Sequence, residues 1–162
     1  MVSTTRHKIG IIGTGYVGLV AGTCFSNKGN LVTCFDIDQE RVKTLSSGEV
    51  PFYEPGLADM VKLNKKEGRL NFSLMDAEIM NSLDLIFICV GTPDDGTGKT
   101  SLEQIDNAIR FIIENVDDKK ILVIRSTVPI GTCKSISNRI KEESSFDHIV
   151  CSNPEFTKEG VA

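Results

Sequence analysis

The residues with the clearest chemical potential form a glycine-rich motif near the N-terminus. In the stretch GTGYVG, Gly13, Gly15 and Gly18 have the spacing G-x-G-x-x-G, and Tyr16 and Val17 are the variable residues before the last glycine. The motif follows an apolar run and opens an amphipathic segment, which is the context that a dinucleotide-binding site requires. There the first glycine permits a tight turn, the second lets a pyrophosphate approach the backbone, and the third lets helix and strand pack closely.

An acidic residue lies where the adenosine ribose of a dinucleotide is expected. Asp36 ends the second apolar run of the chain. A carboxylate there can accept hydrogen bonds from both ribose hydroxyls and would repel a 2′-phosphate, so the pattern favours NAD over NADP. Arg41 could hold such a phosphate, but on a helix that begins near Asp38 we expect it near the adenosine or in solvent.

A second group of candidate residues lies near the C-terminus. The stretch SNPEFTKEG carries Glu155 and Glu159 behind Asn153 and Pro154. Pro154 restricts the preceding residue to an extended conformation and could aim the following carboxylate. By themselves, two such glutamates are also typical of a solvated helix start, because charged pairs are common on protein surfaces.

The elements expected to position these residues alternate along the chain. The apolar runs are short and continuous, as in parallel strands covered by helices on both faces, and segments with helical periodicity separate them. We therefore predict an α/β fold: a Rossmann-type, doubly wound, mainly parallel sheet flanked by helices, formed by residues 1–162 as one domain. The predicted strands are Ile9–Ile12, Leu31–Phe35, Leu70–Phe72, Leu85–Val90, Ile121–Ile124 and Ile149–Cys151.

Two predicted helices carry specific signals. One extends from Leu102 to Val116, and Ser101 and Gln104 are expected to form a capping box at its start. The other follows the glycine motif, and its expected buried stripe comprises Val17, Val20, Ala21, Cys24 and Phe25.

Ligands of doubly wound sheets bind at the carboxyl ends of the strands. Polar residues and glycines follow five of the predicted strands at those ends, so we expect these residues to lie around one crevice. These residues are Gly13, Asp36, Gly91, Thr92, Ser126, Thr127 and Asn153 to Glu155.

Composition argues against several other classes of function. The chain has 162 residues, of which 40% are apolar and 25% charged, and its formal net charge is −4. It has no block of Lys and Arg, so we expect no nucleic-acid partner. No apolar run could span a bilayer and the N-terminus lacks a signal-peptide pattern, so we expect a cytoplasmic protein without a membrane partner. Gly98-Lys99-Thr100 does not complete a phosphate-binding loop, because Pro93 occupies the required glycine position.

The cysteines give no sign of a metal site or of a disulfide framework. All five are scattered singly, no C-x-x-C pattern occurs, and the chain has only two histidines. Four of the five lie in apolar surroundings, so we expect buried, reduced thiols.

Several stretches together resemble the UDP-glucose/GDP-mannose dehydrogenase family. In chain order they are GTGYVG, PFYEPGL, FICVGTP, RSTVPIGT and NPEFTKEG. The resemblance covers Lys8 to Ala162 and corresponds to the N-terminal, NAD-binding domain of that family. It implies oxidation of the 6-hydroxymethyl group of a nucleotide sugar, here UDP-glucose to UDP-glucuronate, by two NAD+. The family's intermediate is a cysteine thioester, which water hydrolyses.

The resemblance also implies roles for individual residues. Glu155 matches an acid/base glutamate that activates or positions the hydrolytic water, and Thr127 matches a threonine that helps hold this water. Glu159 matches a glutamate at the nicotinamide end of the cofactor. The residues that would border the dinucleotide are Val90, Gly91, Thr92, Pro93, Ser126 and Thr127. Those that would line the sugar are Glu155, Phe156, Thr157, Lys158 and Glu159.

Other parts of the family's active site are expected outside these residues. The family's nucleophilic cysteine lies in a G-G-x-C-F motif of a later domain, and residues 1–162 contain no such motif. The central helix for dimerisation and the C-terminal substrate domain are also expected beyond residue 162. We therefore expect this chain to bind NAD without turning over UDP-glucose, and the full-length protein to form a homodimer or a higher oligomer.

Three alternatives remain open from the sequence. The substrate could be GDP-mannose or a UDP-N-acetyl-hexosamine. The chain could belong to another two-domain Rossmann oxidoreductase, of the 3-hydroxyisobutyrate or 6-phosphogluconate dehydrogenase group. It could also be a non-enzymatic NAD-binding module.

Overall fold

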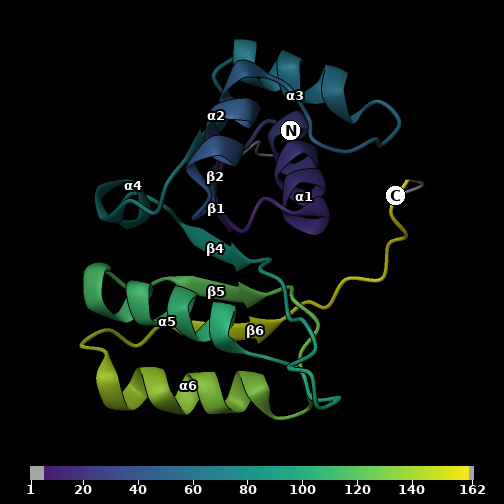
Figure 1. The fold of residues 1–162 in the computed structure, drawn as a ribbon. Coiled ribbons are helices and arrows are strands. Elements are labelled where there is room, and N and C mark those ends of the chain that lie inside the picture. The colour runs from purple at the N-terminus through teal and green to yellow at the C-terminus, as the bar shows by residue number, and fades with distance from the viewer. Residues whose placement is uncertain (1–5, 161–162) are drawn as a thin grey trace, which may run out of the picture.

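The fold is a single parallel sheet with helices on both faces. The computed structural model describes residues 6–160, and its six strands lie in the order β3-β2-β1-β4-β5-β6 (Figure 1). All neighbouring strands pair in parallel. The chain begins at the centre, fills one half of the sheet, and then crosses over to fill the other, which confirms the predicted doubly wound fold. The strands are β1 (Lys8–Ile12), β2 (Leu31–Phe35), β3 (Leu70–Ser73), β4 (Leu85–Ile88), β5 (Ile121–Ile124) and β6 (Ile149–Ser152).

The helices form two layers because successive side chains of a strand point to opposite faces. Ile11 of β1 packs in an apolar cluster with the first three helices, whereas Ile12 packs in a second cluster with the last three. Figure 1 shows α5 in front of the sheet and α1 beside β1 and β2. The helices are α1 (Tyr16–Asn27), α2 (Gln39–Ser47), α3 (Leu57–Lys66), α4 (Ala77–Asn81), α5 (Glu103–Asn115) and α6 (Thr132–Glu143).

Strand β4 ends earlier than the sequence predicts. Its last residue is Ile88, so Cys89 and Val90 belong to the loop that follows. The Cys89 N–H still donates to the Ile12 carbonyl oxygen at 2.8 Å, but there β1 ends and its chain turns away. The apolar run therefore continues beyond the strand and forms part of the crevice wall.

The predicted stripe of helix α1 is correct except at Cys24: Ala21 is buried, and Val17, Val20 and Phe25 pack against the core. Cys24 is exposed, whereas the small residues Gly22, Thr23 and Ser26 are buried. A Cβ atom at Gly22 would lie 2.6 Å from the Sγ atom of Cys34, so small residues mark the face that lies closest to the sheet. Counting large apolar residues at helical spacing cannot find such a face, because the closest approach requires the smallest side chains.

The predicted capping box of α5 is also wrong. The helix begins after Leu102, and the Ser101 hydroxyl only accepts a long hydrogen bond of 3.5 Å from the Glu103 N–H. Gln104 does not reach back to its own helix start. Its Oε1 atom accepts from the Gly91 N–H at 3.1 Å instead, because the loop after β4 lies across the start of α5.

The prediction of buried thiols holds for part of the cysteines. Cys34 and Cys89 are buried, but Cys24 and Cys151 are exposed and Cys133 is half-buried. Cys151 is exposed because β6 is an edge strand with few side chains over it. All five cysteines lie in the described part of the chain, and all are free.

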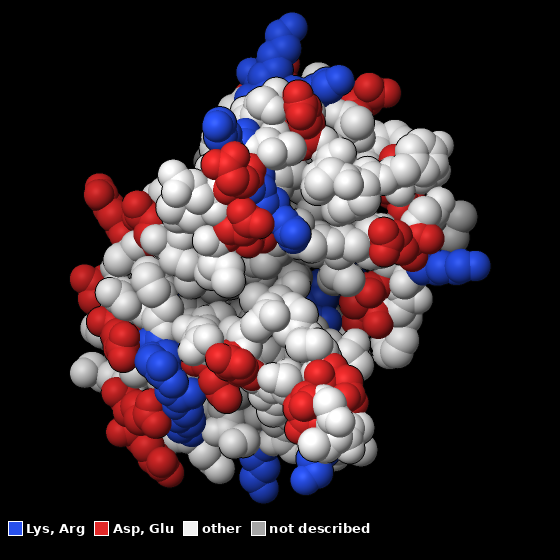
Figure 2. Space-filling view, in the orientation of Figure 1, with Lys and Arg blue, Asp and Glu red and all other residues white. Residues whose placement is uncertain are grey.

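The surface carries both signs of charge. Figure 2 shows acidic and basic side chains interspersed over the face it presents, with a hollowed, mainly uncharged region between them. None of the helices in residues 6–160 is long and apolar enough to cross a membrane.

Substitution of Gly18 by Ala tests the close packing of α1. An added Cβ would overlap the Gly13 carbonyl oxygen and lie 3.2 Å from the Cβ of Cys89. We expect Gly18→Ala to lower the free energy of unfolding by about 1–3 kcal/mol, measured by urea denaturation with circular dichroism. In an unobstructed helix the same change would stabilise by about 0.5–1 kcal/mol.

Gly15→Ala is the matched control, since no described heavy atom lies within 4 Å of its added Cβ and its φ of −65° suits alanine. It should cost about 1 kcal/mol or less, through the weaker capping by alanine. Equal losses in the two variants would contradict the packing argument.

Candidate functional site

The main candidate site is a crevice at the carboxyl ends of the central strands. Its volume is about 610 Å³, within the range of small-molecule sites. The glycine motif and the ends of β2 and β4 form its walls, and α5 closes one side. Of the residues predicted to bind the cofactor, those that line it are Gly13, Gly15, Asp36, Arg41, Val90 and Gly91.

The glycine loop offers backbone to a ligand. Gly13 has a φ of +97°, and a Cβ there would lie 2.8 Å from the Cys89 carbonyl oxygen, so only glycine fits. Gly15 caps α1 without any side-chain hydrogen bond to the first turn, and nothing described lies within 4 Å of a Cβ added to it. The helix start therefore presents free N–H groups and open space, which together fit a pyrophosphate.

Asp36 is held firmly by the same loop. Its Oδ2 atom accepts from the Thr14 N–H at 2.9 Å and from the Thr14 hydroxyl, and its Oδ1 atom accepts from the Asp38 N–H at 3.0 Å. Burial tends to raise the pKa of Asp36, but these hydrogen bonds and the charge of Arg41 outweigh it and hold that pKa below its usual value. The carboxylate is therefore charged at neutral pH and oriented into the crevice wall.

Thr14 is a site residue that the sequence reasoning missed. It is completely buried and supplies two of the three hydrogen bonds to Asp36. A carboxylate has about four acceptor positions, so about one stays open for a ribose hydroxyl while the Thr14 hydroxyl is in place. A hydroxyl residue between the first two glycines, paired with an acid ending the second strand, is the signal that could have revealed it.

Loops after β4 and β5 are tied together by their side chains. The Ser126 hydroxyl donates to the Val90 carbonyl oxygen at 2.7 Å, and the Thr92 hydroxyl donates to the Thr127 carbonyl oxygen at 2.9 Å. The two predicted segments thus lie side by side, although Thr92, Ser126 and Thr127 do not line the crevice itself.

The C-terminal segment has no regular structure in the described residues and crosses the same end of the molecule (Figure 1). At its start Asn153 accepts a hydrogen bond of 2.8 Å from the Nη1 atom of Arg125, and near its end the Lys158 carbonyl oxygen accepts one of 3.0 Å from the Tyr16 hydroxyl. Glu155 is half-buried and accepts from the Thr157 N–H. The glutamates do not start a helix within the described residues.

Glu155 lies within electrostatic reach of the crevice. Burial raises the pKa of the Cys89 thiol to about 12, and of the two nearby charges Arg125 lowers it while Glu155 raises it further. Cys89 lines the crevice, whereas Glu155 is not among the residues that line it. Within residues 6–160, however, no hydrogen bond joins Glu155 to Thr127. Phe156 is 91% exposed, and Glu159 is exposed as well.

Helix α5 contributes a wall that the sequence analysis did not anticipate. Gln104, Asn107 and Phe111 line the crevice, together with Met75 from the segment before α4. The three α5 residues recur at i, i+3 and i+7, so they form a helical stripe beside the buried one. Because two of these residues are polar amides, a search for apolar periodicity does not detect the stripe.

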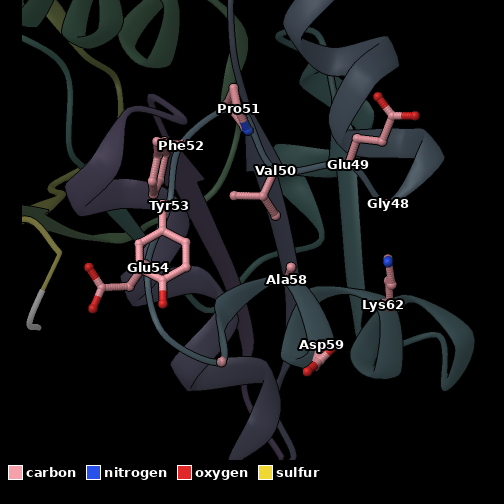
Figure 3. Close-up of a pocket in the computed structure, with 11 residues that line it drawn as sticks. Gly48, Glu49, Val50, Pro51, Phe52, Tyr53, Glu54, Ala58, Asp59 and Lys62 are labelled. Carbon is pink, nitrogen blue, oxygen red and sulfur yellow. The ribbon is translucent and has the colours of Figure 1, made fainter.

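A separate, open hollow of about 750 Å³ lies between the end of α2 and the first turns of α3 (Figure 3). The segment from Gly48 to Lys62 forms all of its lining. It contains none of the residues predicted to carry chemistry, so the glycine-loop crevice is the better candidate for the cofactor.

Thr14→Val tests the hydrogen bonds to Asp36. Because the pKa of Asp36 is lowered in the folded state, its contribution to stability is present above its unfolded pKa of about 4 and is lost as the pH falls through the folded value. Removing the Thr14 hydroxyl should therefore cost about 1–2 kcal/mol at neutral pH and less in acid. Urea denaturation across this pH range measures the difference.

Thr23→Val is the control, because the buried Thr23 hydroxyl has no hydrogen-bond partner among the described residues. Its removal should leave stability unchanged or raise it at every pH. A deficit in Thr14→Val that does not depend on pH would contradict the role of the Thr14 hydroxyl.

Comparison with known proteins agrees with this geometry. Residues 7–162 match the model of the UDP-glucose/GDP-mannose dehydrogenase family, NAD binding domain. The chain is 45% identical over 159 residues to UDP-glucose 6-dehydrogenase TuaD of Bacillus subtilis (strain 168), covering 96% of this chain and 34% of that protein.

Two solved structures are similar over nearly the whole chain. A UDP-glucose dehydrogenase from the hyperthermophilic archaeon Pyrobaculum islandicum superposes with a TM-score of 0.91 at 32% identity, over 99% of this chain and 38% of that one. A GDP-mannose dehydrogenase from Pseudomonas aeruginosa superposes with a TM-score of 0.87 at 32% identity, over 94% of this chain and 37% of that one. The chain thus spans little more than a third of the length of the relatives it matches. With the cofactor crevice, its topology and the family match in agreement, the chain belongs to the UDP-glucose/GDP-mannose dehydrogenase family and constitutes the NAD-binding domain of that family.

Proposed function

We propose that this domain serves a nucleotide-sugar 6-dehydrogenase that oxidises UDP-glucose to UDP-glucuronate with two NAD+. The observation that carries the proposal is the crevice formed by the glycine loop and the fixed Asp36 carboxylate, at the same end of the sheet as the segment that follows β6 and carries Glu155. A relative that is 45% identical bears the name UDP-glucose 6-dehydrogenase, which supports this choice of sugar.

The proposed cofactor contacts follow the crevice. Backbone N–H groups at Gly15 and the start of α1 would hold the pyrophosphate of NAD+, and Asp36 would bind the adenosine ribose and repel a 2′-phosphate. Arg41 would lie beside the adenosine. Bound NAD+ would supply the hydride acceptor that the oxidation requires. The remaining residues proposed to border the cofactor are Tyr16, Val17, Gly18, Val90, Gly91, Thr92, Pro93, Ser126, Thr127 and Glu159.

Glu155 is the proposed acid/base group. Oxidation of an alcohol releases a proton, and a carboxylate close to the reacting carbon can take it up. The same carboxylate could later activate or position the water that hydrolyses a thioester, with Thr127 helping to hold that water. The exposed stretch from Glu155 to Glu159 would lie along the sugar, partly through its backbone groups.

The thioester is proposed to form on a cysteine outside these residues. Burial raises the pKa of both Cys34 and Cys89, so neither is a good source of thiolate at neutral pH. The exposed Cys24 lies on α1, and none of the five cysteines lies in the G-G-x-C-F motif that carries the family's nucleophile. Dimerisation and recognition of the sugar's nucleotide are likewise proposed for other parts of the full-length protein.

A second candidate substrate is GDP-mannose. A GDP-mannose dehydrogenase with 32% identity shares this fold with a TM-score of 0.87, so the domain architecture alone serves more than one sugar nucleotide. A substrate screen on the full-length protein separates the two.

Isothermal titration of the chain with NAD+ and NADP+ tests the cofactor site. We expect NAD+ to bind and NADP+ to bind at least about tenfold more weakly, because the Asp36 carboxylate repels the 2′-phosphate.

Variants test which residues cause this preference. Asp36→Asn should reduce the discrimination between the two cofactors, and Gly15→Ala should weaken the binding of both, because its methyl group occupies the approach to the helix start. Glu49→Gln, in the separate hollow, is the control without effect. Equal affinity for the two cofactors, or no binding of either, would refute the proposed site.

A second assay tests whether the chain is sufficient for turnover. With UDP-glucose and NAD+ in excess, the purified chain should bind NAD+ but form no NADH, as followed by NADH fluorescence. The reason is that recognition of the sugar's nucleotide, which must place the alcohol beside the cofactor, is proposed for other parts of the full-length protein. The full-length protein is the positive control. NADH formation by the chain itself would overturn the proposal that the chain is insufficient for turnover.

A further inference from the structure

The sequence stretch PFYEPGL has no part in the function proposed above, yet it contacts the segment that carries the catalytic glutamate. It lies between α2 and α3. Its Glu54 is only 9% exposed, and the Oε2 atom accepts a hydrogen bond of 2.7 Å from the N–H of Gly160. In Figure 3 the Glu54 carboxylate points away from the labelled hollow residues and toward the yellow C-terminal segment. Two stretches separated by most of the chain therefore meet at this carboxylate.

A second side chain holds the same segment from α1. The Tyr16 hydroxyl donates to the Lys158 carbonyl oxygen at 3.0 Å. The Tyr16 ring packs edge-on against Phe52, with 5.6 Å between ring centroids and an interplanar angle of 63°. Phe52 belongs to the same stretch as Glu54, so the two hydrogen bonds come from one packed unit. Burial and the nearby charges of Glu54 and Glu155 raise the pKa of Tyr16, which keeps its hydroxyl protonated as a donor.

The two hydrogen bonds bracket Glu159. One holds the carbonyl group before this residue and the other holds the N–H group after it. Backbone fixed on both sides can turn little, so the position of the Glu159 side chain and the path of the segment from Glu155 are restricted. The segment has no helix or strand of its own to do this, since residues 153–158 lack regular structure.

Burial of a carboxylate costs free energy unless hydrogen bonds compensate for it. An apolar residue at position 54 would fill the same volume without that cost, so the carboxylate is expected to serve the backbone group that it binds. We propose that Tyr16 and Glu54 are positioning residues that clamp the backbone of residues 158–160 and thereby orient Glu159 toward the nicotinamide end of the cofactor. This inference rests on the proposed function, because only that function gives Glu159 a ligand to face.

The clamp is tested first without any ligand, by NMR measurement of amide exchange at Gly160 in the 162-residue chain. Loss of one hydrogen bond to a charged group should make exchange about tenfold faster in Glu54→Ala. Glu54→Gln should be intermediate, since its amide oxygen can still accept, and Glu49→Gln should match the wild type. Unchanged exchange at Gly160 in Glu54→Ala would overturn the clamp. If this variant does not fold, Tyr16→Phe replaces it, because phenylalanine keeps the ring packing and removes only the hydroxyl. We then expect 15N relaxation to show faster backbone motion at Lys158 and Glu159.

The positioning role is tested by titration with NAD+ and with ADP-ribose, which lacks the nicotinamide. In Glu54→Ala we expect NAD+ to bind about three- to tenfold more weakly, while the affinity for ADP-ribose stays unchanged. Equal losses for both ligands would mean a merely structural role and would overturn the proposal, as would no loss for either. If the wild type binds neither ligand, the proposed cofactor function fails, whereas exchange at Gly160 still decides whether the clamp exists.

Discussion

The contact on which the site depends is the approach of α1 to the backbone of the glycine loop. At Gly18 a side chain of any size would overlap the Gly13 carbonyl oxygen, and at Gly22 it would press on the Sγ atom of Cys34. This absence of side chains lets the helix start directly beyond the end of β1. Because the helix starts there, its free N–H groups and the positive end of its dipole face the crevice. The anion site is therefore a consequence of helix packing and needs no positively charged side chain.

The polar groups around the crevice serve the fold and the site together. Parallel strands end with backbone groups that the sheet no longer pairs, and these groups need partners. Here side chains are the partners. Asp36 accepts a hydrogen bond from the Thr14 N–H, Gln104 accepts one from the Gly91 N–H, and the Ser126 hydroxyl donates one to the Val90 carbonyl oxygen. The carboxylate that would select NAD over NADP thus also stabilises the glycine loop. Changes in cofactor preference at this position are expected to affect stability as well.

The C-terminal segment shows how an irregular stretch can be held in place. It receives one anchor from Arg125 at its start and two from Tyr16 and Glu54 near its end. These anchors come from the loop after β5, from α1 and from the loop before α3, which lie far apart in the sequence. Segments that carry functional groups without regular structure depend on such contacts, because their own backbone hydrogen bonds do not fix them.

The sequence by itself determined the order of the elements and the location of the crevice. The apolar runs predicted five of the six strands to within about one residue at either end. The glycine spacing with Asp36 predicted the end of the sheet at which the crevice lies, because turn geometry and strand order are local properties. Only the tertiary structure decided which face α1 buries, that Gln104 bonds to Gly91 and not to its own helix start, and that Thr14 orients Asp36. It also decided that Tyr16 and Glu54 meet at the C-terminal segment. These contacts join residues far apart in the chain or depend on the absence of a side chain, and neither property leaves a periodic pattern in the sequence.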